Sequence, residues 1–220
     1  MASYFTLTLD TTAPSGVSVS INGDDIYTTV RNVTLTIGVS DGNTGGYQMK
    51  VWGIQGVDSE SAASWESFAE SKSVQLTDGD GLKTVYVKVR DDVGNESTTA
   101  SDTITLNTVV PTVTIAGPDK TRISKVSTFD KSVFNFTSDV IFDEYKVCVV
   151  PSSNSTQEAG TVIGTSGGSL NTSGSAGDYP ASTNIQVTIT GADLEAASSG
   201  DGAKIIKVFV KSQAGFWSAA

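Results

Sequence analysis

Residues 80–97 decide the fold of this chain, and they read Asp80-Gly81-Leu82-Lys83-Thr84-Val85-Tyr86-Val87-Lys88-Val89-Arg90-Asp91-Asp92-Val93-Gly94-Asn95-Glu96-Ser97. Three valines alternate with Tyr, Lys and Arg, and this period of two places the valines on one buried face of a β-strand. Asp-Gly precedes the strand and Gly-Asn follows it, and both pairs are typical of tight turns. The stretch therefore predicts a turn, a strand and a second turn.

The same unit recurs at residues 201–218, which read Asp-Gly-Ala-Lys-Ile-Ile-Lys-Val-Phe-Val-Lys-Ser-Gln-Ala-Gly-Phe-Trp-Ser. Ile206, Val208 and Val210 hold the positions of the three valines. Residues 9–14 match 106–111 in the same way, and residues 47–51 match 145–149. A chain that repeats its strands in this manner is built from two copies of one domain.

Other short alternating segments lie between turn residues, and they give about seven strands per copy, a pattern typical of β-sandwiches. We therefore predict an all-β chain of two tandem Ig-like antiparallel β-sandwiches. The predicted parts are an N-terminal strand or arm at 1–9, a first domain at 10–107 and a second domain at 108–220.

Composition excludes several classes of function. The 220 residues carry a net charge of −10, of which −8 falls before residue 108 and −2 after it. Such a surface repels phosphate, so we expect no nucleic-acid partner. No apolar run approaches the roughly 20 residues that span a membrane, so we expect no membrane insertion.

The supply of reactive side chains is equally restrictive. The chain contains no histidine, which removes the usual general base and zinc ligand. The single cysteine, Cys148, lies in an alternating segment and is expected to be a small buried apolar residue. We therefore predict no enzymatic activity, no catalytic residue and no cofactor.

Both copies resemble the Ig-like, or fibronectin-III-like, repeats of tailed-bacteriophage virion proteins and bacterial surface proteins. The resemblance rests on the entry linker 9–14, the strand 33–37, Trp65 and the unit 80–95. It covers most of residues 7–107; the second copy is looser, although its Trp217-Ser218 ending also looks like phage versions. The resemblance implies a display or adhesion module and brings no catalytic residues.

Two functions follow from the resemblance. The first is a structural virion protein that decorates the capsid or tail or contacts the host, with other virion proteins, copies of itself or a host cell-surface glycan as partners. The second is a glycan- or protein-binding adhesin module of a bacterial surface protein. An adhesin needs export, and the first residues lack the basic and apolar regions of a signal peptide. We therefore expect a virion protein that is synthesised in the host cytoplasm.

The two copies differ at their ends. Residues 98–107 follow the unit 80–97 and hold the last strand of the first copy, whereas only two alanines follow residues 201–218. Phe5-Thr6-Leu7-Thr8-Leu9 resembles Asp102-Thr103-Ile104-Thr105-Leu106 in that last strand. One hypothesis is strand exchange, in which residues 4–9 of one copy complete the second domain of the next. The alternative is that residues 4–9 pair inside their own first domain.

Strand exchange assigns interface residues at both ends of the chain. They are Phe5, Leu7, Leu9, Val208, Val210, Phe216 and Trp217.

A second candidate site is a calcium site made of oxygen ligands in the loops around residues 80–97, which could meet at one end of the sandwich. Its ligands would be Asp78, Asp80, Asp91, Asp92 and Asn95. The alternative is that these side chains bond their own backbone in tight turns. Trp52, Trp65 and Trp217 could likewise stack on sugar rings, or fill the core and the joint between domains.

Overall fold

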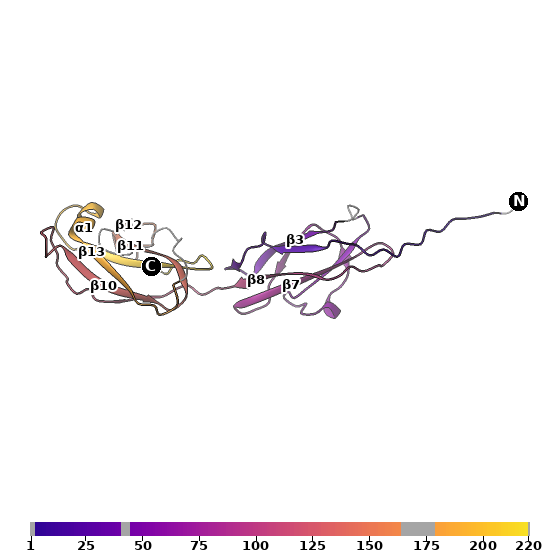
Figure 1. Ribbon diagram of the computed structural model, residues 1–220, viewed down its shortest axis with the longest axis horizontal. Helices are drawn as coiled ribbons and strands as arrows, with labels where there is room; N and C mark the ends of the chain where they lie inside the picture. Colours follow the sequence, from indigo (N-terminus) through magenta and orange to yellow (C-terminus); the bar gives the residue numbers. More distant parts are fainter. Residues whose placement is uncertain (1–2, 41–44, 164–178, 220) are drawn as a thin grey trace. The chain divides into compact units, whose positions relative to one another are not determined.

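The computed structural model describes residues 3–40, 45–163 and 179–219. The chain forms two compact units, Met1–Thr108 and Val109–Ala220, which we call unit 1 and unit 2. Each unit has its own sheets, as the ribbon in Figure 1 shows, and its own buried core.

Unit 1 is a sandwich of two β-sheets, one with the order β1-β3-β6 and the other with the order β2-β8-β7-β4-β5. Neighbouring strands are antiparallel except for β2, which is parallel to β8. The elements are β1 (Ser18–Ile21), β2 (Tyr27–Thr28), β3 (Asn32–Gly38), β4 (Gln48–Trp52), η1 (Glu60–Ala62), β5 (Glu66–Ser67), β6 (Ser71–Gln75), β7 (Gly81–Arg90) and β8 (Ala100–Leu106).

The core of unit 1 follows from the alternation along β7. Val85, Val87 and Val89 are fully buried between the sheets, as their spacing predicted. They pack with residues of the same period in the facing sheet, among them Leu35 and Ile37 of β3. Because strands present every second residue to one face, one apolar residue in two is enough to build this core.

Unit 2 has the sheets β13-β10-β9 and β12-β11-β14. Its elements are β9 (Val113–Ala116), β10 (Lys131–Ser138), β11 (Phe142–Val150), β12 (Thr161–Val162), β13 (Ile185–Thr190), α1 (Gly191–Ala197) and β14 (Ile205–Ser212). Aromatic rings fill much of its core, and the Phe136 and Tyr145 rings meet edge to face at 5.1 Å.

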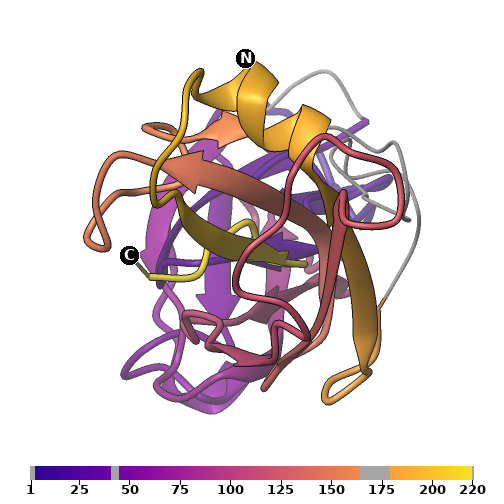
Figure 2. The same ribbon diagram turned by 90° about the vertical axis from the view of Figure 1, so that its left-hand side faces the viewer.

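The helix α1 follows β13 directly (Figure 2), and a reciprocal cap at Thr190 starts it. The Thr190 hydroxyl accepts from the Asp193 amide at 3.1 Å, and the Asp193 carboxylate accepts from the Thr190 amide at 3.0 Å. In the part of the chain that the structure describes, no helix has the length and apolar character needed to cross a membrane.

The two units share one strand plan, which confirms the prediction of tandem Ig-like β-sandwiches. In sheet order, β9, β10 and β13 of unit 2 correspond to β1, β3 and β6 of unit 1. In the other sheet, β14, β11 and β12 correspond to β7, β4 and β5. Among the described residues of unit 2, no strand corresponds to β8.

The N-terminal arm, residues 3–9, forms no strand. Its apolar side chains are exposed, with Phe5 at 83%, Leu7 at 85% and Leu9 at 87%. The arm runs clear of the strands of unit 1 (Figure 1). The expectation that residues 4–9 pair inside their own domain is therefore wrong for this structure, and the reason is that β8 already occupies the sheet edge that their sequence matches.

The fold predicts how β8 contributes to stability. Ile104 of β8 is fully buried, whereas Thr103 beside it is exposed. We expect Ile104→Ala to lower the free energy of unfolding of unit 1 by about 2–5 kcal/mol, because it leaves a cavity in the core. We expect Thr103→Ala to change it by less than about 0.5 kcal/mol. Urea unfolding followed by tryptophan fluorescence measures both, and equal losses would contradict the strand assignment.

Candidate functional site

The outer edge of β14 is the most unusual feature of unit 2. Its counterpart β7 lies between β4 and β8, but among the residues that the structure describes β14 has a neighbouring strand, β11, on one side only. The described residues that follow β14 make a turn, in which Trp217 bridges to Lys211 and the Ser218 amide donates to the Val210 carbonyl at 2.8 Å. An unpaired strand edge of this kind can accept a further strand.

The repeat shows which part of β14 lacks a neighbour. In unit 1, β8 pairs with residues 81–87 of the β7 segment. The matching residues of unit 2 are 202–208, and the turn that follows β14 pairs with Val210, Lys211 and Ser212 beyond them.

A groove lies along this same edge, between β9 of one sheet and β14 of the other. It holds two cavities, one of about 850 Å³ and one of about 370 Å³, and Ile115 and Ile206 line both. In unit 1, Ile104 and Leu106 of β8 are buried in the core next to β1 and β7. We call the space in unit 2 the β9–β14 groove; its apolar lining includes Val113, Ile115, Phe134, Leu194, Ile206 and Val208.

Equivalent residues of the two units differ in exposure at the β9–β14 groove. Ile21 and Val85 of unit 1 are fully buried. Their counterparts in unit 2 are Ile115, which is 45% exposed, and Ile206, which is half-buried. The side chains are of the same apolar type, so the difference comes from the missing cover and not from local sequence.

Basic side chains surround the larger cavity. Lys120, Arg122 and Lys204 line it, and among the described lining residues Asp201 is the only acidic one. Lys207 lines the smaller cavity and donates to the Ser153 carbonyl at 2.9 Å. The groove therefore combines an apolar floor with a positive rim, in a chain that is acidic overall.

The structure places the predicted interface residues in three environments. Phe5, Leu7 and Leu9 lie in the exposed arm. Val208 and Val210 are buried in the core of unit 2, so β14 offers its backbone edge there and not these side chains. Phe216 and Trp217 are half-buried in the turn after β14. Sequence reasoning missed Ile115 and Leu194, because only the fold brings them beside β14.

The five residues of the predicted calcium set do not come together. Asp78 and Asp80 precede β7, and Asp91, Asp92 and Asn95 follow it, so the ten residues of β7 separate the two groups by about 33 Å. Asp78 is paired with Arg31, and Asp80 accepts from the Thr108 amide at 2.9 Å. Within the described ranges, no cluster of three or more His, Cys, Asp or Glu side chains could hold a metal ion.

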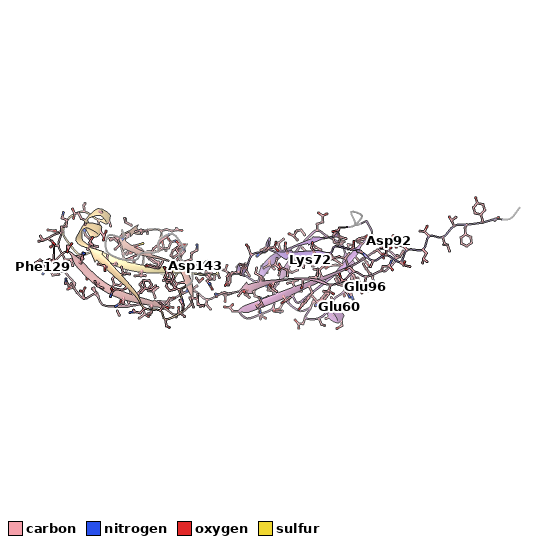
Figure 3. The ribbon with its side chains drawn as sticks, in the orientation of Figure 1. Glu60, Lys72, Asp92, Glu96, Phe129 and Asp143 are labelled. Atoms are coloured by element: carbon pink, nitrogen blue, oxygen red, sulfur yellow. The ribbon has the colours of Figure 1, made fainter. Side chains whose placement is uncertain are left out.

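Asp91 instead organises the turn between β7 and β8. Its carboxylate accepts from the Val93 amide at 3.0 Å, the Asn95 amide at 2.8 Å and the Asn95 side chain at 2.8 Å. Burial raises the pKa of Asp91, but these hydrogen bonds together outweigh burial, so the net pKa is below the ordinary value. Figure 3 places Asp92 in the same turn, at the end of unit 1 from which the arm leaves.

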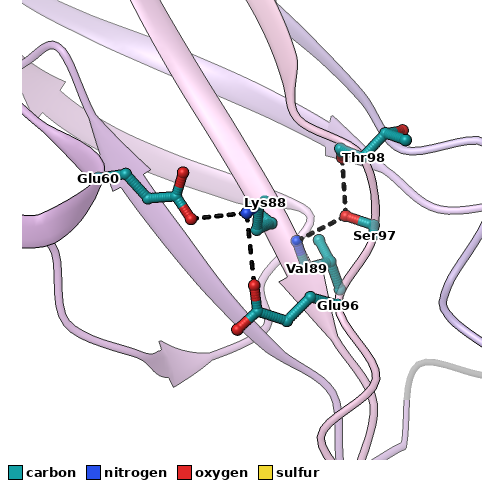
Figure 4. A network of polar contacts seen from close by, with 6 residues as sticks. All are labelled: Glu60, Lys88, Val89, Glu96, Ser97 and Thr98. Carbon is teal, nitrogen blue, oxygen red and sulfur yellow. Dashed lines mark hydrogen bonds and ion pairs between the residues drawn. The ribbon is translucent and has the colours of Figure 1, made fainter.

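Polar contacts hold the strand beside this turn (Figure 4). The Lys88 ammonium lies 2.6 Å from a carboxylate oxygen of Glu60 and 3.3 Å from one of Glu96. The pKa of Lys88 is raised, and its hydrogen bond to Glu60 is the largest cause. The Ser97 hydroxyl accepts from the Val89 amide at 3.0 Å. Ser218 makes the same contact with the Val210 amide at 3.3 Å, so the turn chemistry of the repeat is kept in unit 2.

The three tryptophans are engaged inside their own units. Trp52 is buried and stacks on Tyr86 with ring centroids 5.5 Å apart. The Arg90 guanidinium carbon lies 4.4 Å from the centroid of the Trp65 ring, and the Lys146 ammonium nitrogen lies 4.5 Å from the centroid of the Trp217 ring. These cation–π contacts occupy ring faces that a sugar would need.

Cys148 is buried, as expected, and burial raises the pKa of its thiol. A thiol with a raised pKa carries little thiolate and is a poor nucleophile.

No protein-family model matches the chain, and no curated protein matches it. Solved structures with a similar arrangement include the fibronectin(III)-like modules of Clostridium thermocellum CbhA, with a TM-score of 0.48 and 10% identity over 91% of this chain and 89% of that one. The FN1–FN3 domains of chicken CNTN1 give a TM-score of 0.35 and 13% identity, over 92% of this chain and 62% of that one. Chitinase ChiA74 from Bacillus thuringiensis gives 0.32 and 14%, over 92% of this chain and 30% of that one.

The separation of the carboxylates predicts the response to metal removal. We expect excess EDTA to leave the melting temperature of the chain unchanged, because the five oxygen ligands lie in two separate groups and four of them, Asp78, Asp80, Asp91 and Asn95, already have protein partners. Differential scanning fluorimetry with EDTA and with added Ca²⁺ measures this. A melting temperature that rises with Ca²⁺ and falls with EDTA would contradict the structure.

The lowered pKa of Asp91 predicts that the stability of unit 1 depends on pH. A carboxyl whose pKa is lowered by folding stabilises the protein above its unfolded pKa, near 4, and this contribution disappears as the pH falls through the lower folded pKa. We expect Asp91→Asn to lower the midpoint of urea unfolding at pH 7 and to cost progressively less as the pH falls below about 4. Asp92→Asn, which changes an exposed residue of the same turn, is the control. A cost that does not depend on pH would contradict the assignment.

Proposed function

We propose that this chain is a non-catalytic structural protein of a tailed-phage virion, which decorates the capsid or tail or contacts the host surface. The observation that carries the proposal is that, among the described residues of unit 2, the outer edge of β14 has no neighbouring strand and lies beside an apolar groove, whereas β8 covers the same edge in unit 1. Such an edge suits a protein whose work is to join other proteins.

The reactive side chains support a role without catalysis. The chain has no histidine, and the thiol of Cys148 is buried with a raised pKa. The carboxylates around β7 are taken up by turns and ion pairs. General acid–base and nucleophilic catalysis both need such groups accessible and activated.

Charge supports a partner that is a protein or a neutral surface. The net charge of −10 opposes binding to nucleic acid and favours solubility at high local concentration. The expected partners are therefore other virion proteins, further copies of the chain or a host cell-surface glycan.

The resemblance of residues 7–107 to phage and bacterial surface repeats supports both a virion protein and an adhesin. The tryptophan contacts separate the two. Arg90 lies over the Trp65 ring and Lys146 lies over the Trp217 ring, so the described surface offers these rings poorly to sugars. This favours the virion protein over the glycan-binding adhesin.

Location tests this function directly. An antibody against the purified chain is applied by immunogold labelling to phage particles and to uninfected cells of the source culture. We expect label on particles and the chain in their mass spectra. Label on cell envelopes but not on particles would overturn the virion role and favour the adhesin. Binding of the purified chain to a glycan array tests the adhesin independently.

A further inference from the structure

We propose that the N-terminal arm of one copy adds as a strand to the outer edge of β14 of a second copy and fills the β9–β14 groove. The inference deepens the proposed function by naming the occupant of the open edge, and it applies to a virion protein and to an adhesin alike. It takes from the proposed function only the role of that edge as a joining surface.

The sequence of the arm matches the strand that unit 2 lacks. Leu7 and Leu9 align with Ile104 and Leu106, the two β8 residues that are fully buried in unit 1. Thr6 and Thr8, which alternate with the leucines, align with Thr103 and Thr105, which face away from the core. The arm thus has the period and the apolar face of β8, but its own side chains are exposed.

Unit 1 supplies the register. There Ile104 pairs with Lys83 and Leu106 pairs with Gly81, in antiparallel orientation. Residues 202, 204 and 206 of unit 2 correspond to residues 81, 83 and 85 of unit 1, and residues 5, 7 and 9 of the arm correspond to residues 102, 104 and 106 of β8. The same register therefore gives three facing pairs, which are Phe5–Ile206, Leu7–Lys204 and Leu9–Gly202. These are the residues of β14 and its approach that line the two cavities, so the strand would lie where the space is.

The difference between the arm and β8 at position 5 also fits the groove. Phe5 stands where unit 1 has Asp102, whose carboxylate accepts from the Ile21 amide at 2.7 Å. In unit 2 the counterpart of Ile21 is Ile115, which is 45% exposed beside a cavity of about 850 Å³. A phenyl ring fills such a space and covers Ile115 and Ile206, whereas a carboxylate would not.

Charge favours a second copy as the source of the strand. In this register Asp10, which directly follows Leu9, would face Asp201, so the Lys120, Arg122 and Lys204 side chains that line the cavity would have to balance two carboxylates. The rest of the donor unit is also acidic, with a net charge of −8 before residue 108. Acidic and basic surfaces that approach each other steer association and suppress the wrong partners.

The exit points of unit 1 favour exchange between copies. The Asp10 carbonyl accepts from the Asn95 side chain at 3.3 Å, so the arm leaves at the turn that ends β7. The chain continues to unit 2 after Leu106, which pairs with Gly81 at the start of β7, about 33 Å away. A contact in which each copy gives an arm and receives another is heterologous, and it closes into a ring or extends into a filament.

Light scattering after size exclusion tests the assembly on the 220-residue chain. We expect assemblies that grow with concentration, that become monomers when residues 2–9 are removed, and that Leu7→Asp weakens roughly tenfold or more. The matched control is Thr6→Asp, which adds the same charge on the outward face of the arm and should leave the association near that of the parent. Both positions are exposed in the free arm, so neither change should affect folding.

Cysteine pairing tests the register. A copy with Phe5→Cys mixed with a copy with Ile206→Cys should form a disulfide-linked heterodimer under mild oxidation, whereas Thr6→Cys with Ile206→Cys should not, because residue 6 faces the other side. Cys148 is buried and should not compete.

Several results would overturn the inference. These are a monomeric parent chain, assemblies that persist without residues 2–9, equal effects of Leu7→Asp and Thr6→Asp, or failure of the Phe5→Cys and Ile206→Cys copies to form a heterodimer. None of these measurements involves phage particles, so strand exchange can fail while the virion role stands, and the reverse.

Discussion

A strand inside a sheet carries hydrogen-bonding groups along both edges, and the pairing of both edges is the constraint on which this structure depends. In unit 1, β8 pairs with the outer edge of β7 and so satisfies its hydrogen-bonding groups. The same strand buries Ile104 and Leu106 between the sheets. In the described part of unit 2, β14 has a neighbouring strand on one side only, and a groove lies next to its other side. The open edge and the open core are thus two consequences of one unpaired strand.

Unit 1 serves as an internal reference for unit 2, because the repeat keeps the local chemistry around the unpaired strand. The hydroxyls of Ser97 and Ser218 accept equivalent amide hydrogen bonds after the two turns. The valine face of β7 recurs in β14 with apolar residues of similar size. Since the local structure is the same, the half-exposed Ile115 and Ile206 report the absence of a neighbouring strand among the described residues.

The charged residues that could have served a binding site instead make contacts that stabilise the fold. Asp91 holds a turn, Lys88 links two glutamates beside it, and Arg90 and Lys146 lie over tryptophan rings. These contacts stabilise the sandwiches and leave few groups for binding small molecules. What the surface does offer is backbone edge, apolar floor and a basic rim, all in one groove of unit 2. This combination suits association with another polypeptide better than chemistry on a substrate.

The all-β class, the repeat and the buried face of β7 could be predicted from the sequence, because strand period and turn chemistry are local properties that a few adjacent residues express. The sequence also singled out Phe5, Leu7 and Leu9 through their match to β8. Only the tertiary structure decided that the calcium set is split across the length of β7 and that Val208 and Val210 are buried. It alone placed Ile115 opposite Ile206, since these residues lie far apart in the chain and meet only when the two sheets pack. The groove is a property of that packing, and no local pattern in the chain encodes it.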